Sequence, residues 1–332
     1  MIISKTPLRI SFFGGGTDYP DYFTKYGEGA VLGTTIDKYV FVSISKFYSK
    51  LFDYSIRISY KQVECVNSLD ELKHVPFKEC LRLHGITNDV EVDYTAELPA
   101  FTGLGSSSSF IVGLLKSLHA FKGQEMDKLD LAREAIKVER DILKEPVGYQ
   151  DQTFAAFGGL NLIKFTQDKI DVQPVVLSQS RYDEFEDHLM LFFTGIKRKA
   201  SDIIQNQINK VDQNKESLNS LRQMVDQAYD ILTGTSSLSE FGALLDKGWQ
   251  MKRKLHHTVS NDTIDKIYHD GISAGALGGK LLGAGGGGFL LFFVPPKMKG
   301  AVREKLAHLT EIPIKMSTQG SHILNGTAPG TR

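Results

Sequence analysis

The chain has 332 residues, of which 41% are hydrophobic and 23% charged, a composition typical of a globular protein with one large domain or two. Lys and Arg together number 39, as do Asp and Glu, so no global basic charge favours nucleic acid as a partner. No apolar run has the length of a transmembrane helix, and residues 1–5 alternate like a strand rather than a secretory signal. We therefore expect a cytoplasmic protein without a membrane partner.

The two cysteines, Cys65 and Cys80, are too few for a disulfide framework or a four-cysteine zinc site. Cys80 and His84 have the i, i+4 spacing of neighbours on one helix face. Two ligands without a second pair favour a structural role over metal binding.

In the first half, runs of apolar residues with strand and helix periodicity follow one another. We expect strands at residues 8–13, 40–45, 55–60, 90–95, 160–165 and 172–176, and helices at 69–83, 110–118 and 126–143. Asp127 is placed to cap the last of these helices.

The second half predicts strands at residues 189–193, 289–294 and 312–316, and helices at 201–233, 238–255, 263–276 and 298–309. The polar segment 179–187 indicates a boundary between an N-terminal domain (1–182) and a C-terminal domain (183–325), and residues 326–332 read as a frayed tail. Strands and helices without regular alternation predict an α+β fold.

The sequence GLGSSSS at residues 103–109 lies between an alternating strand and an apolar helix, so it is a tight loop rather than a linker. Glycines allow close backbone approach, and the first N–H groups of a helix attract anions. No lysine follows, as the Walker phosphate loop requires. A phosphate cradle of another kind and an ordinary turn with a serine cap both fit this stretch.

A second glycine cluster, residues 283–288, formally matches the dinucleotide-binding pattern G-x-G-x-x-G. That site requires a strand before the loop and a helix after it, whereas here a helix precedes and a strand follows. This inverted context disfavours a Rossmann site. Close approach of the loop to a ligand is favoured over approach to another segment of the chain.

A third cluster, Gly14 to Asp18, follows the first strand. One interpretation is a turn closed by an Asx-type hydrogen bond. The other gives Arg9, in the preceding strand, a role in stabilising a phosphoryl group during transfer.

Two carboxylates, Glu139 and Asp151, flank a helix-stopping Pro146. Asp151 suits a helix cap or a base that accepts a proton from a hydroxyl nucleophile. Glu139 suits an exposed helix position or a magnesium ligand.

The order of these motifs resembles that of the GHMP small-molecule kinases, the superfamily of galactokinase, homoserine kinase and mevalonate kinase. The resemblance is carried by residues 7–18, 103–107, 148–152 and 283–288, and it spans nearly the whole chain. It implies an α+β fold of two domains, ribosomal-protein-like at the N-terminus and ferredoxin-like at the C-terminus, with ATP and Mg²⁺ as cofactors.

The resemblance also assigns roles to single residues. The ATP-phosphate loop comprises Gly103, Leu104, Gly105, Ser106, Ser107 and Ser108. Ser107 and Glu139 match the metal ligands, although the spacing from Glu139 to Asp151 differs by a residue from some members. Asp151 matches the catalytic base and Arg9 the cation that polarises the acceptor. The residues implied to contact the substrate are Gly15, Gly16, Thr17, Asp18, Gly285 and Gly286. Many members have a small or polar residue after the last glycine loop, whereas this chain has Phe289. The resemblance is therefore applied to that loop and not to the residues that flank it.

Within the superfamily, four stretches resemble the sugar 1-kinases that act on D-glycero-D-manno-heptose 7-phosphate: PLRISFFGGGTD, TTIDKYVFVSI, FFTGIKRKASDI and GALGGKLLGAGGGGFLLFF. The implied partners are ATP and a sugar phosphate, and a homodimer is the default assembly. Lys197 and Arg198 suit the acceptor's phosphate, but equally a solvated helix start; Lys280 is a weaker candidate.

Three other functions remain open from sequence. The chain could phosphorylate an unphosphorylated sugar such as fucose, galactose or a hexosamine, or sense sugar and ATP without catalysis. The presence of all four residues Arg9, Ser107, Glu139 and Asp151 disfavours the sensor. The GGGTD motif suits a polyhydroxylated acceptor, which disfavours an isoprenoid-pathway kinase.

Overall fold

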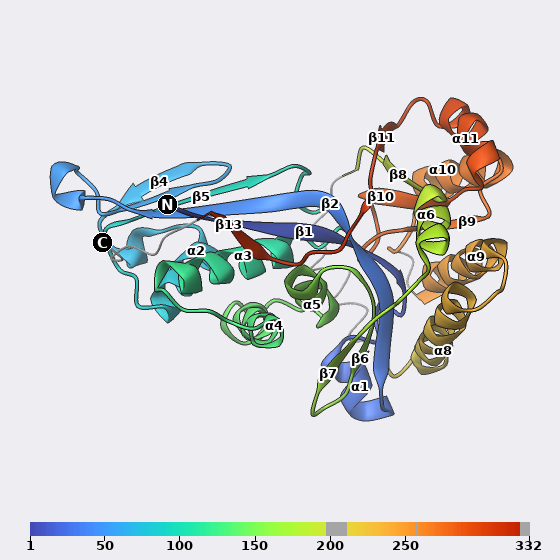
Figure 1. The fold of residues 1–332 in the computed structure, drawn as a ribbon, viewed down its shortest axis with the longest axis horizontal. Helices are drawn as coiled ribbons and strands as arrows, with labels where there is room; N and C mark the ends of the chain where they lie inside the picture. Colours follow the sequence, from blue (N-terminus) through green and yellow to red (C-terminus); the bar gives the residue numbers. More distant parts are fainter. Residues whose placement is uncertain (197–210, 256–257, 326–332) are drawn as a thin grey trace.

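The computed structural model describes residues 1–196, 211–255 and 258–325, which form two sheets covered by helices (Figure 1). The larger sheet has nine strands, with the path β13-β1-β2-β5-β3-β4 and with β6, β7 and β12 joined through β2. Its strands are β1 (Ile2–Phe13), β2 (Gly29–Lys46), β3 (Ile56–Ser59), β4 (Val63–Val66), β5 (Val90–Ala96), β6 (Leu160–Phe165), β7 (Ile170–Pro174), β12 (Met316–Ser317) and β13 (His322–Asn325).

The smaller sheet is antiparallel, in the order β11-β8-β10-β9. Its strands are β8 (Leu189–Phe193), β9 (Gly278–Leu281), β10 (Phe289–Phe293) and β11 (Thr310–Ile312). The helices are α1 (Pro20–Tyr26), α2 (Val75–Leu83), α3 (Ser106–Phe121), α4 (Lys128–Lys137), α5 (Gln150–Phe157), α6 (Gln179–Asp187), α8 (Lys215–Thr233), α9 (Leu238–Leu255), α10 (Asp262–Ser273) and α11 (Lys299–Lys305). None of the helices in the described ranges is both long and apolar enough to cross a bilayer.

The long strand β2 connects the two halves of the larger sheet. It pairs with β1 along most of its length, with β6 near its start and with β5 near its end. Towards its end, buried Val40, Val42 and Ile44 alternate with more exposed residues, because one face there is covered by helices and the other is not.

Helices α2, α3, α4 and α5 cover one face of the larger sheet (Figure 1). Helix α3 lies close to β1 because Gly113 has no side chain: a Cβ there would stand 2.8 Å from Thr6 Oγ1. The apolar residues of α3, among them Ile111 and Leu115, fill the layer between sheet and helices. The N-terminal end of α3, which follows the GLGSSSS loop, is thereby held on a rigid support.

A continuous aromatic core joins the two halves of the chain. The ring of Phe12, at the end of β1, makes edge contacts with Phe185 of α6 and Phe241 of α9. Phe293 of β10 packs on the same two rings. Each such aromatic contact contributes on the order of 1 kcal/mol beyond burial, so these contacts hold the two halves together.

The predicted α+β class is confirmed, and most expected strands and helices are present. Several details differ, and helix α1 and strand β4 were also not expected. The segment 179–187, expected as a domain boundary, forms helix α6, whose Phe185 is buried in the core. Strand β9, which is rich in glycine, was not expected. Residues 316–325 pair with β1 and β2 in the larger sheet, so the end of the predicted C-terminal domain packs on the N-terminal one. The helix expected at 126–143 becomes a π-helix at Val138–Ile142. The predicted tail, 326–332, lies outside the described residues.

Candidate active site

A cleft lies between the end of β1, the N-terminus of α3, the start of α5 and helix α9. It is bordered by residues of all four predicted motifs, which are far apart in the sequence. Arg9, Asp18, Ser107, Asp151 and Gly283 all line it. The chemistry of the site follows from how these groups are held.

The loop before α3 leaves the first N–H groups of that helix available to an anion. Gly105 is the N-cap residue, in the left-handed conformation with φ +74°, and no side chain in the described ranges caps this end. The serine cap considered from sequence is therefore absent. A Cβ on Gly105 would stand 3.1 Å from Arg9 Cγ, and one on Gly103 would stand 2.3 Å from the Leu282 carbonyl oxygen. An open helix N-terminus of this kind suits a phosphate.

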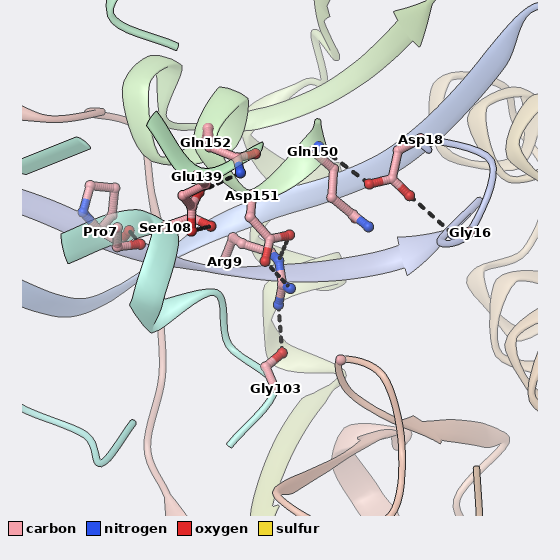
Figure 2. Close-up of polar contacts among 12 residues, drawn as sticks. Pro7, Arg9, Gly16, Asp18, Gly103, Ser108, Glu139, Gln150, Asp151 and Gln152 are labelled. Carbon is pink, nitrogen blue, oxygen red and sulfur yellow. Dashed lines mark hydrogen bonds and ion pairs between the residues drawn. The ribbon is translucent and has the colours of Figure 1, made fainter. Parts of the chain in front are cut away.

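The Glu139 carboxylate is buried behind this loop, on the π-helix, not on an exposed helix face. Ser108 Oγ donates to Glu139 Oε1 at 3.1 Å, and Gln152 Nε2 donates to Oε2 at 2.5 Å (Figure 2). Burial raises the pKa of Glu139 to about 8, an effect that these two hydrogen bonds only partly offset. Within the described ranges Glu139 forms no ion pair, so a cation would relieve the cost of its charge.

This environment fits a magnesium ion, because a buried carboxylate without a cationic partner borders the cleft beside the candidate phosphate loop. Of the two serines, Ser107 is exposed in the cleft, whereas Ser108 is buried and holds Glu139. The metal role assigned to Ser107 stays a prediction.

Arg9 and Asp151 form a bidentate ion pair at the centre of the cleft (Figure 2). Arg9 Nε and Nη2 donate to the two carboxylate oxygens at 2.8 and 2.7 Å, and Nη1 donates to the Gly103 carbonyl. Asp151 lies in the first turn of α5, but its side chain does not cap that helix. The helix-cap interpretation of Asp151 is therefore wrong.

Asp18 is buried and borders the cleft, where it contacts Gly16 and Gln150 (Figure 2). It accepts hydrogen bonds from the backbone N–H groups of Gly16 at 3.0 Å and Gln150 at 3.3 Å. Burial, and next the charge of Asp151, raise the pKa of Asp18 to about 6. A Cβ on Gly148 would stand 2.0 Å from Asp18 Oδ2, so only glycine fits beside it.

The remaining residues predicted to contact the substrate differ in whether they border the cleft. Gly15 and Gly16 line the cleft. Thr17 is fully buried and ties the turn together, because its Oγ1 donates to the carbonyls of Gly14 and Ala30. Lys197 and Arg198 lie outside the described residues.

The glycine loop between β9 and β10 packs mainly against other chain segments. A Cβ on Gly285 would stand 2.7 Å from Val259 Cα, and Gly286 N–H donates to the Val259 carbonyl. Only Gly283 and Ala284 of this loop border the cleft. The close approach that the glycines permit is thus largely to protein backbone, contrary to the ligand contact favoured from sequence.

Two lysines, Lys252 and Lys280, also line the cleft. Lys252 Nζ donates to the Gly283 carbonyl, and Lys280 Nζ donates to the carbonyls of Ser11 and Phe12. Burial, then the charge of Arg9, lowers the pKa of Lys252 to about 8. Lys252 was missed from sequence, although it continues the buried face of Leu245 and Trp249 at helical spacing.

Comparison with known proteins agrees with this geometry. The sequence matches the GHMP kinases N terminal domain over residues 72–159 and the GHMP kinases C terminal domain over residues 227–309. It is 33% identical over 318 residues to D-glycero-alpha-D-manno-heptose 7-phosphate kinase from Campylobacter jejuni, covering 90% of this chain and 91% of that protein.

Two further proteins are similar over nearly the whole chain. L-fucokinase/L-fucose-1-P guanylyltransferase from Bacteroides fragilis is 28% identical over 340 residues, which are 91% of this chain and 35% of that protein. The crystal structure of a D-glycero-D-manno-heptose 1-phosphate kinase from Bacteroides thetaiotaomicron has a TM-score of 0.81 at 24% identity, covering 99% of this chain and 100% of that chain.

The fold and the cleft define a small-molecule kinase, and the chain belongs to the GHMP kinase family. It is a sugar kinase of that family, a phosphotransferase with the two-domain α+β fold.

Proposed function

We propose that the chain transfers the γ-phosphoryl group of ATP to the anomeric hydroxyl of D-glycero-D-manno-heptose 7-phosphate, giving the 1,7-bisphosphate. One observation carries the proposal: the Arg9–Asp151 pair lies in the same cleft as the uncapped N-terminus of α3. The first supplies a base and a cation, and the second supplies a phosphate site. The 33% identity to a heptose 7-phosphate kinase supports the choice of acceptor.

In this account the chain holds ATP and the sugar in line for direct transfer. The ATP phosphates lie over Gly103–Ser108, a segment of which all residues but Leu104 border the cleft. Asp151 accepts the proton of the attacking hydroxyl; each of its oxygens takes one hydrogen bond from Arg9 and retains a lone pair for the substrate. Arg9 offsets the charge that develops on the transferred group.

Ser107 and Glu139 would hold magnesium. That ion, when bound, neutralises charge on the β- and γ-phosphates. Asp18 would accept hydrogen bonds from sugar hydroxyls, because its carboxylate borders the cleft and its other contacts are to backbone N–H groups.

A phosphorylated acceptor requires a cation, and Lys252 is the best-placed described candidate. Its amine faces the cleft, and its lowered pKa reflects the burial of a charge that a phosphate would stabilise. Lys280 is committed to two backbone carbonyls and has a structural role.

The proposal is tested by ADP release from ATP and Mg²⁺ with heptose 7-phosphate, its dephosphorylated form, mannose, fucose, galactose and mevalonate. We expect strong preference for the 7-phosphate. Lys252→Met should raise its KM while leaving that of the dephosphorylated sugar unchanged. Lys247→Met, on the exposed face of the same helix, is the control.

Preference for an unphosphorylated sugar would support kinase activity but contradict the proposed contact between the chain and a phosphate on the acceptor. If no acceptor is phosphorylated although ATP still binds, the result would favour the alternative function, a non-catalytic sensor of sugar and ATP.

A further inference from the structure

Three side chains from neighbouring helices meet at a point away from the cleft. His84 follows α2, His119 lies near the end of α3, and Glu134 lies on α4; these helices lie side by side beneath the larger sheet (Figure 1). One ligand atom from each lies within 4.8 Å of the others. None of the three borders the cleft formed by the described residues.

The distances resemble those within a metal coordination sphere. Glu134 Oε2 is 2.7 Å from His119 Nε2, and Glu134 Oε1 is 3.4 Å from His84 Nε2. Zinc bonds of about 2.0–2.2 Å in a tetrahedral arrangement place ligand atoms about 3.3 Å apart. The two distances run to different oxygens of Glu134, and one ligand atom from each residue lies within 4.8 Å of the others, so the side chains must shift to bring three ligand atoms to this separation around an ion.

Two ring nitrogens of the cluster, one from each histidine, face the Glu134 carboxylate. His84 is 7% exposed, and its Nε2 atom faces Glu134 without a hydrogen bond to any described residue. His119 Nδ1 donates to Gln124 Oε1 at 3.2 Å, which fixes the tautomer of a neutral ring. The lone pair of His119 Nε2 then faces a carboxylate oxygen. Either a second proton on His119 or a cation must lie between them.

We propose that His84, His119 and Glu134 bind a divalent transition-metal ion, Zn²⁺ in the first instance, at a site separate from the active-site cleft. Two imidazoles and one carboxylate form a ligand set that zinc accepts, and the partly exposed edge of Glu134 leaves room for a water as fourth ligand. The contact between His119 and Gln124 is the kind of outer hydrogen bond that orients a ligating histidine.

Cys80, one turn before His84, is excluded from the site. Its thiol is not among the ligand atoms that lie within 4.8 Å of one another, and burial raises the pKa of that thiol. The ion therefore joins α2, α3 and α4 through one residue from each, and it stabilises the helical layer that carries the candidate phosphate loop at the other end of α3.

The test uses the full chain, stripped of metal by a chelator and kept in excess Mg²⁺, which prefers oxygen ligands and leaves imidazole sites free. Zn²⁺ binding is measured by calorimetry, and Co²⁺ binding by the visible absorption of tetrahedral cobalt. We expect one Zn²⁺ per chain, a rise in Tm that grows with free Zn²⁺, and tetrahedral cobalt bands.

His119→Ala and Glu134→Gln should each weaken Zn²⁺ binding at least tenfold and remove the Tm shift. His308→Ala, which changes an exposed histidine of the smaller domain, should change neither. If His119→Ala does not fold, the far-UV circular dichroism will show it, and Glu134→Gln alone then decides.

Two results would overturn the proposal. One is Zn²⁺ binding of unchanged stoichiometry and affinity in a folded Glu134→Gln variant. The other is an NMR spectrum in which His119 carries protons on both ring nitrogens and does not respond to Zn²⁺. The test measures metal binding and not kinase turnover. Its outcome therefore does not depend on whether the proposed sugar-kinase function is correct.

Discussion

Arg9 and Asp151 are 142 positions apart in the sequence, yet two guanidinium nitrogens of one donate to both carboxylate oxygens of the other. The pair joins strand β1 to helix α5 across the cleft. It fixes the orientation of the carboxylate before any substrate arrives, because a bidentate pair has one favoured geometry. A carboxylate held in this way would need little rearrangement to act as the proposed base.

Replacing the base should separate chemistry from binding. Asp151→Asn retains the size of the side chain but removes its charge, so we expect kcat to fall about 10²- to 10⁴-fold. ATP affinity, measured by calorimetry, should change little, because Asp151 is separate from the Gly103–Ser108 loop. Near-normal turnover would show that no base is required.

Asp18 should make the stability of the protein fall as the pH rises towards neutrality, a dependence that the corresponding amide would not show. The pKa of Asp18 is raised from 3.8 to about 6, mainly by burial. The folded protein therefore retains this proton between about pH 4 and pH 6, where the unfolded chain has lost it, and stability falls as the pH rises through that window. Asp18→Asn escapes this loss, which amounts to about 3 kcal/mol above pH 6.

Urea unfolding at about pH 5 and about pH 7.5 measures this effect. The stability advantage of Asp18→Asn should be larger at the higher pH, and the same variant should raise the KM of the sugar far more than that of ATP. An advantage that does not grow with pH would contradict the raised pKa. Equal effects on both KM values would contradict the sugar contact.

Gly148 should be intolerant of a side chain because of Asp18. In Gly148→Ala the new Cβ would stand 2.0 Å from Asp18 Oδ2, so Asp18 must move or the backbone must shift. We expect a loss of about 1–3 kcal/mol in unfolding free energy and a raised sugar KM.

Gly300→Ala is the matched control, since a Cβ at that helical position meets no atom within 4 Å. It should be neutral or stabilise by up to about 1 kcal/mol. Similar losses in the two variants would show that the clash with Asp18 is not the cause.

The two serines of the phosphate loop should differ in their metal dependence. Ser107 is exposed in the cleft, whereas Ser108 holds Glu139 through a hydrogen bond. We expect Ser107→Ala to raise the Mg²⁺ concentration needed for half-maximal rate more than Ser108→Ala does. The reverse order, measured in Mg²⁺ titrations at saturating ATP, would assign the metal contact to Ser108.

The fold could be predicted where local pattern and tertiary packing agree. Helix α9 matches its predicted bounds because its buried and exposed residues alternate with helical periodicity. Strand β9 was missed since Gly278 and Gly279 are weak strand formers, and their place is set by close packing: a Cβ on Gly278 would stand 2.0 Å from the Gly242 carbonyl. The pairing of β13 with β1 is a long-range contact that leaves no local signal.

The candidate site was anticipated through motif order, but the relations between its side chains were not. The spacing of the motifs in the sequence does not show that Arg9 donates hydrogen bonds to Asp151. Nor does it show that Ser108 rather than Ser107 contacts Glu139. Lys252 looks like an ordinary helix residue until the packing of α9 turns it towards the cleft. The cluster of His84, His119 and Glu134 depends on three helices meeting, so only the first of these residues drew attention in the sequence.

The most direct test of the central claim is ³¹P NMR of the product formed from ATP, Mg²⁺ and heptose 7-phosphate. The account predicts one ADP per sugar and a second sugar-phosphate resonance that is coupled to the anomeric proton. A new phosphate on any other hydroxyl, or no transfer to the sugar while ATP remains bound, would contradict it.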